Sequence, residues 1–166
     1  MRRHIVKIFE LAKQVEKNGE KFYLDLAIKT TDIGLKNIFT LLAQDEKKHY
    51  AVLESMEQEN DFELTDTNIL KEAKEIFQNI KDRAVQINGS TSHQEVYEVA
   101  LKNEEKSIEI YGQLLGSTIF ENRREVIIKI IEEEKKHKYL IEQLIEFIRR
   151  PEFWLENAEF NHLDEY

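Results

Sequence analysis

The chain has no cysteine, one proline and five glycines among its 166 residues. The absence of cysteine excludes disulfides, thiolate metal ligands, iron–sulfur clusters and zinc ribbons. Because proline and glycine are scarce, few positions would interrupt a helix. No apolar run approaches the ~20 residues that a membrane span needs. The basic N-terminal residues are not followed by the apolar stretch of a signal peptide. We therefore expect a helical, cytoplasmic protein with no membrane partner.

Positive charge is also in short supply. The net charge is −9, and no stripe of lysine and arginine gathers on one face, so we do not expect a nucleic-acid partner. A hydrophobic content of 41% suits a globular protein, and 166 residues suffice for one domain with a single core.

What the chain does contain is a motif written twice. The sequence Glu-Lys-Lys-His occurs in two copies 88 residues apart, and a glutamate and a tyrosine precede each copy at the same separation. The repeated positions are Glu16, Tyr23, Glu46 and His49 in the first half and Glu104, Tyr111, Glu134 and His137 in the second. A period of 88 is longer than the roughly 20–50 residues of common solenoids, and suits a duplicated helix pair. The repeat therefore indicates one site built from two equivalent halves.

The spacing inside the motif is that of a helix. Residues three apart lie on one helix face, ~4.5 Å along the axis, so both side chains of Glu-x-x-His can reach the same small volume. Each candidate also occupies a slot where the apolar periodicity calls for a core residue, as Glu46 does between Leu42 and Leu53. A buried carboxylate is unfavourable unless it is paired or bound to a metal. We predict a metal site with the ligands Glu16, Glu46, His49, Glu104, Glu134 and His137. Oxygen and nitrogen donors without sulfur suit iron or manganese, with zinc as a substitute.

The pattern predicts an all-α protein of five helices, over residues 3–29, 33–59, 68–87, 92–115 and 120–149. Either Thr31 or Asp32 can cap the second helix. Residues 1–150 would form one domain in which residues 60–90 are a helical crossover between two helix pairs. The aromatic residues of the tail, 151–166, lead us to expect that it docks on this domain.

Two helix pairs joined by one long crossover give a ferritin-like four-helix bundle, in which two helices each supply a glutamate and two supply Glu-x-x-His. Over residues 3–149 the chain resembles the rubrerythrin branch of the ferritin-like di-iron carboxylate proteins. The resemblance implies two iron ions, bridged by Glu46 and Glu134, with the other four residues as terminal ligands. Tyr23 and Tyr111 also match; they are either plain core residues or redox and hydrogen-bonding partners of the ligands.

Three departures qualify the resemblance. Without cysteine there is no rubredoxin domain, Ser107 stands where rubrerythrin has an extra glutamate, and Lys47 stands where bacterioferritin usually has a haem-binding methionine. We expect a homodimeric oxidoreductase that reduces peroxide or dioxygen with electrons from a separate donor such as a rubredoxin-like protein. The alternatives are ferrous iron oxidation and storage, and a bundle in which metal serves stability alone.

Overall fold

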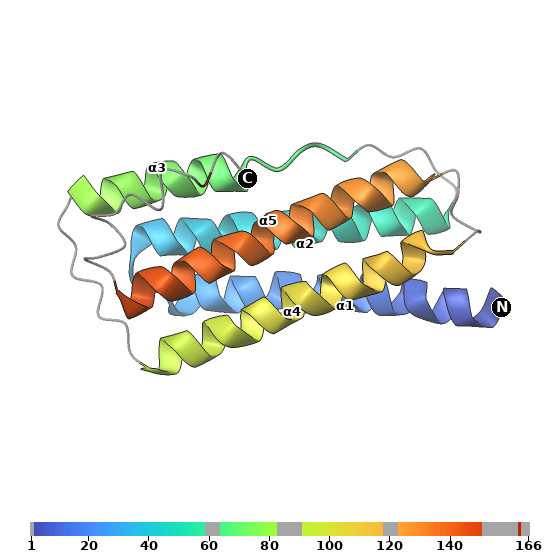
Figure 1. The fold of residues 1–166 in the computed structure, drawn as a ribbon, viewed down its shortest axis with the longest axis horizontal. Coiled ribbons are helices and arrows are strands. Elements are labelled where there is room, and N and C mark those ends of the chain that lie inside the picture. The colour runs from blue at the N-terminus through green and yellow to red at the C-terminus, as the bar shows by residue number, and fades with distance from the viewer. Residues whose placement is uncertain (1, 59–63, 83–90, 118–122, 151–162, 164–166) are drawn as a thin grey trace.

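The computed structural model describes residues 2–58, 64–82, 91–117, 123–150 and 163. Over these residues the chain forms five helices and no strand: α1 (Arg2–Lys29), α2 (Ile33–Glu57), α3 (Ile69–Asp82), α4 (Thr91–Leu115) and α5 (Arg124–Arg149). The four long helices lie side by side, and α3 runs along the outside of the bundle (Figure 1). The predicted all-α, ferritin-like bundle is thus confirmed. None of the described helices is long and apolar enough to cross a membrane.

The helix boundaries follow local chemistry. Asp32 caps α2: its backbone is extended, and its side-chain Oδ1 accepts a hydrogen bond from the Leu35 N–H at 2.9 Å. The structure thus selects Asp32 over Thr31. Helix α3 is described as far as Asp82, where the prediction continues to residue 87, and α5 begins at Arg124 rather than 120. The remaining residues of those predictions, 83–87 and 120–122, lie outside the described part of the chain.

The crossover helix α3 packs on α2 and α5, across from α1 and α4. Phe77 of α3 meets Phe147 of α5 edge to face, with ring centroids 5.2 Å apart. On the other side, Gly34 lets α3 approach the first turn of α2. A Cβ added to Gly34 would lie 2.7 Å from Cγ2 of Ile76, closer than side chains tolerate. Through this close packing, α3 contacts α2 of the first helix pair and α5 of the second.

The core is divided into two apolar clusters with a polar layer between them. The first cluster includes Leu42 and Phe77, and the second includes Phe9 and Leu53. Along α2 the chain passes from Leu42 in the first cluster, through the Glu46 motif, to Leu53 in the second. Apolar packing on both sides therefore holds the polar layer in place and keeps it dry.

Of the C-terminal segment, the structure describes Leu163, which is fully buried in the first cluster. The predicted docking of the tail as a whole lies outside the described residues, since 151–162 and 164–166 are not among them.

Candidate metal centre

The six residues predicted as metal ligands meet in the polar layer. None of them is more than 3% exposed. Helices α1 and α4 each contribute one glutamate, and α2 and α5 each contribute a Glu-x-x-His pair. The residues are Glu16, Glu46, His49, Glu104, Glu134 and His137. All four long helices therefore converge on one volume, as the repeat predicted.

These side chains form two overlapping groups, each of which could hold an ion. One consists of Glu16, Glu46, His49 and Glu134, and the other of Glu46, Glu104, Glu134 and His137. Within each group the ligand atoms lie within 4.8 Å of one another. Glu46 and Glu134 belong to both groups, which is the arrangement expected of carboxylates that bridge two metals. Each ion position would combine three residues of one half with one glutamate of the other.

Unpartnered polar atoms support this reading. Four side-chain atoms of the six residues, each able to bind a metal, are buried without a hydrogen-bond partner among the described residues. They are Glu16 Oε2, Glu46 Oε1, Glu134 Oε2 and His137 Nδ1. Buried polar groups rarely stay unsatisfied, so several converging on one point require something that accepts their electron pairs. Carboxylate oxygens with imidazole nitrogens suit iron or manganese. The residues present therefore fit a pair of such ions.

Crowded carboxylates perturb one another. Burial, followed by the charge of Glu134, raises the pKa of Glu46 well above its ordinary value. Burial likewise raises the pKa of Glu104 to about 8. Burial also acts to raise the pKa of Glu134, but interactions with the His137 and His49 rings outweigh it and hold that pKa low. Without a cation, the site therefore retains protons that metal binding would displace.

An outer carboxylate fixes the orientation of each histidine. The Nε2 atom of His49 lies 2.7 Å from Glu133 Oε2, and Nε2 of His137 lies 3.1 Å from Asp45 Oδ2. With Nε2–H donating outward, Nδ1 of each ring faces the carboxylates of the centre. Nδ1 is therefore the atom that would bind metal, and the outer carboxylate strengthens it as a ligand.

Our reading of the sequence missed Asp45 and Glu133. Each directly precedes the glutamate of a Glu-Lys-Lys-His copy, and the two are 88 residues apart. The acidic pair is thus an extension of the repeat by one residue, a signal that could have identified both. Both side chains are buried, at 6% and 2% exposure.

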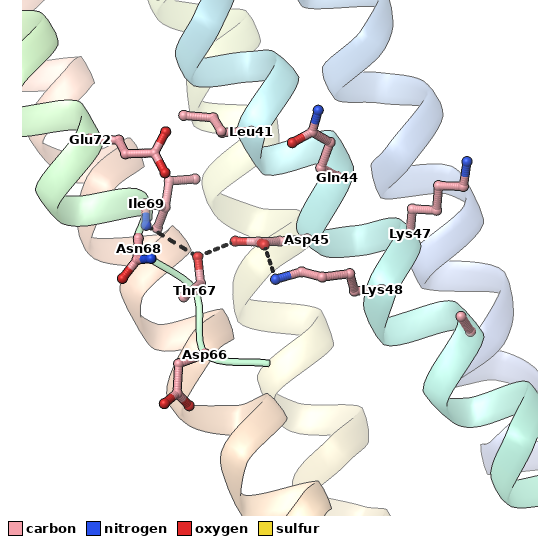
Figure 2. Close-up of a pocket in the computed structure, with 11 residues that line it drawn as sticks. Leu41, Gln44, Asp45, Lys47, Lys48, Asp66, Thr67, Asn68, Ile69 and Glu72 are labelled. Carbon is pink, nitrogen blue, oxygen red and sulfur yellow. Dashed lines mark hydrogen bonds and ion pairs between the residues drawn. The ribbon is translucent and has the colours of Figure 1, made fainter. Parts of the chain in front are cut away.

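Thr67, in the segment leading into α3, ties the two outer carboxylates together. Its hydroxyl donates to Asp45, and its backbone N–H donates to Glu133 Oε1 at 2.9 Å. Lys48 also pairs with Asp45, at 2.6 Å, as Figure 2 shows. Burial acts to raise the pKa of Asp45, but the hydrogen bonds with His137, Lys48 and Thr67 outweigh it and hold the pKa low. Asp45 therefore stays an anion, as a partner for an N–H donor should.

The repeated tyrosines reach across the molecule. Tyr23 donates its hydroxyl hydrogen to Glu104, and Tyr111 donates to Glu16 Oε1 at 2.5 Å. Each tyrosine thus binds the terminal glutamate of the opposite half. Burial, followed by the nearby carboxylate charges, raises both tyrosine pKa values well above the ordinary value, so the phenols remain neutral donors. A redox role for either tyrosine stays a prediction.

Two cavities border the site. The larger, about 520 Å³, lies between α2 and the start of α3 and includes Asp45 and Thr67 but none of the six candidate ligands. The smaller, about 80 Å³, lies between α1 and α4 and is lined by Glu46 and Glu104. The smaller cavity is therefore the one through which a small molecule could meet the ligand cluster.

Comparison with known proteins agrees with this geometry. A family model described as Rubrerythrin matches residues 7–145, which include all six candidate ligands and most of the bundle. No curated protein and no solved structure matches the chain. Since the matched segment covers most of the sequence and carries the whole buried carboxylate–histidine cluster, the chain belongs to the rubrerythrin family.

Proposed function

We propose that the protein is a non-haem di-iron oxidoreductase that reduces peroxide or dioxygen with electrons from a separate donor. The family is one of di-iron proteins, and the buried cluster is compatible with that chemistry. The observation that carries the proposal is the pair of overlapping ligand groups reached by a small cavity. A metal held only for stability needs no such cavity.

The chemistry requires two electrons for each peroxide. Hydrogen peroxide, two electrons and two protons give two waters. A pair of ferrous ions held by these residues would supply the two electrons for one turnover, and a donor would have to restore them. The chain has no cysteine and hence no iron–sulfur or rubredoxin centre of its own. The proposed donor is therefore a redox centre outside these residues, and a rubredoxin-like protein is the expected example.

The chain's own residues would hold the ions and control water and protons. Glu46 and Glu134 would lie between the ions, and the outer carboxylates keep the histidine rings turned inward. The apolar clusters on either side exclude bulk water. Tyr23 and Tyr111 hold the terminal glutamates by hydrogen bonds while those carboxylates remain free to bind metal through their other oxygen.

The test is an anaerobic titration. Protein loaded with two ferrous ions per chain should be oxidised rapidly by hydrogen peroxide, one peroxide for each pair of ions, with a rise in near-ultraviolet absorbance. The Glu46→Ala/Glu134→Ala variant is the control, since it lacks both shared carboxylates. If the loaded wild-type protein stays ferrous with both peroxide and dioxygen, the proposal is wrong.

Particle size and iron content separate this activity from storage. For an oxidoreductase we expect a homodimer that retains two ions per chain after repeated additions of ferrous iron and oxidant. A much larger particle that accumulates many irons per chain would instead indicate iron oxidation and storage.

A further inference from the structure

A fifth buried atom has no hydrogen-bond partner among the described residues. Besides the four ligand atoms of the metal centre, that atom is Oγ of Ser107, a residue only 2% exposed. A serine inside a helix commonly donates to a backbone carbonyl three or four residues earlier. Ser107 makes no such bond, although it lies in the middle of α4. The proposed metal ions would account for the other four atoms, but a neutral hydroxyl is a poor candidate for a ligand and needs another partner.

Ser107 lines the small cavity beside the centre. That cavity also touches Glu46 and Glu104, and its inner hydroxyl groups belong to Ser107 and Tyr23. Tyr23 is already bonded to Glu104. The Ser107 hydroxyl is therefore the uncommitted donor of this inner wall.

The equivalent position in the first half of the repeat is Gly19, 88 residues earlier, and it lines the same cavity. A Cβ added to Gly19 would lie 2.8 Å from Glu46 Oε2, so a side chain there would press against the Glu46 carboxylate. The two halves of the repeat therefore differ at this point: the first has no side chain beside Glu46, and the second supplies a hydroxyl.

We propose that this cavity is a binding subsite for a small, hydrogen-bond-accepting ligand of the metal centre, such as peroxide or a small anion, and that Ser107 donates a hydrogen bond to it. A volume of about 80 Å³ admits a few water-sized atoms and excludes the organic substrates that occupy pockets of roughly 300 Å³ or more. Exposed Lys106 lines the same cavity and favours an anion. With metal bound, Glu46 and Glu104 would be acceptors, and Lys106 is exposed, so Ser107 is the buried donor that the cavity offers.

This subsite rests on the proposed metal centre, and azide is a suitable probe. Azide should bind the oxidised, iron-loaded protein and give a visible charge-transfer band that titrates to saturation. Ser107→Ala should raise the azide dissociation constant about tenfold, the effect expected for one hydrogen bond to a charged ligand. Ser107→Val, which removes the hydroxyl and fills the cavity, should weaken azide further. Ser55→Ala is the matched control, because Ser55 lies on α2 outside this cavity, and it should bind azide as wild type does.

Iron content and the melting temperature are measured for each variant before titration, so that a change in azide affinity is compared at two ions per chain. If Ser107→Ala, fully loaded, binds azide as tightly as wild type, or if loaded wild-type protein binds none, the subsite is refuted. The outcome is independent of the peroxide titration. Azide binding that depends on Ser107 in a protein inert to peroxide would support the subsite while contradicting the proposed reaction.

Discussion

Glu46 and Glu134 differ in the protons they hold, although the repeat makes them equivalent. Interactions with the His137 and His49 rings lower the pKa of Glu134, and His49 Nδ1 lies 2.8 Å from Glu134 Oε1. For Glu46, burial and the charges of the other carboxylates raise the pKa by more than the interaction with His137 lowers it. In the metal-free protein one shared glutamate is therefore an anion and the other prefers a proton. Binding of two metal ions would favour the deprotonated, anionic form of both glutamates.

Metal occupancy should depend on these shared residues most. Because Glu46 belongs to both ligand groups and His49 to one, Glu46→Ala should lower the occupancy of both ions, whereas His49→Ala should mainly lower one. Elemental analysis after dialysis should give about two ions per chain for wild type. The assignment would be contradicted by full occupancy in the Glu46→Ala/Glu134→Ala variant.

The outer carboxylates should tune metal affinity without binding metal. Asp45→Asn and Glu133→Gln keep the shape but weaken the hold on His137 and His49. Each should lower metal affinity by about 10–100-fold, the usual effect of losing a histidine's carboxylate partner. Competition with a chelator measures this. Glu132→Gln, one residue from Glu133 but exposed, is the control, and an equal loss there would show that the effect is only one of net charge.

At the scale of the element, the segment before α3 links α2 and α5 by hydrogen bonds on the outer side of the centre. Thr67 joins Asp45 of α2 to Glu133 of α5, and its hydroxyl oxygen also accepts a bond from the Ile69 N–H at 3.2 Å at the start of α3 (Figure 2). Lys129 of α5 reaches the same segment, with bonds to Leu64 O and Asp66 Oδ1. The crossover is thus linked to both helix pairs through polar contacts beside the buried site.

Removing the Thr67 hydroxyl should destabilise the protein. Thr67→Val leaves a buried Asp45 oxygen short of a donor and removes a bond at the start of α3. We expect a loss of about 1–2 kcal/mol in the free energy of unfolding, measured by urea denaturation. Thr67→Ser retains the hydroxyl and should lose much less. A Thr67→Val variant as stable as wild type would contradict a stabilising role for the hydroxyl.

For the whole molecule, protons or metal ions can stabilise the same buried carboxylate–histidine cluster, and binding of metal would displace the protons. The folded, metal-free protein binds protons at Glu46, Glu104, His49 and His137 that the unfolded chain releases at lower pH. A group whose pKa is raised in the folded state stabilises the folded protein at pH values below its unfolded-state pKa. That contribution is lost as the pH rises through the folded-state pKa. The lowered pKa of Glu134 acts with the opposite sign, but only below its ordinary 4.5.

Between pH 6.5 and 8 the stability of the metal-free protein should therefore fall, by on the order of 1 kcal/mol or more. Urea titrations in chelator at several pH values measure it. Adding ferrous iron should remove most of this slope and raise the melting temperature, since ligand at 100 times its dissociation constant adds ~2.7 kcal/mol. Glu46→Gln should stabilise the metal-free protein, whereas Glu134→Gln should not, because it loses the interactions of the Glu134 carboxylate with the His137 and His49 rings. A flat pH profile in chelator would contradict this account.

The helical class, and the six residues that cluster in the polar layer, could be predicted from the sequence alone. A helix repeats its faces every 3.6 residues, so glutamates in apolar slots must point into the core wherever the helices pack. The 88-residue repeat then placed Glu16 with Glu104 and the two Glu-x-x-His pairs with each other. These inferences needed only local periodicity and internal comparison.

The partners that those residues take could be learned only from how the helices pack. Tyr23 follows Glu16 along one helix face, yet it bonds to Glu104 of the other half, because the helix pairs pack against each other about the shared centre. Asp45 lies next to Glu46 in sequence but about 100° around the helix, so periodicity alone would place it toward solvent. It is buried because His137 and Thr67 reach it from α5 and the crossover. Local spacing fixes the face that a side chain occupies, while what meets that face depends on contacts between segments far apart in the chain.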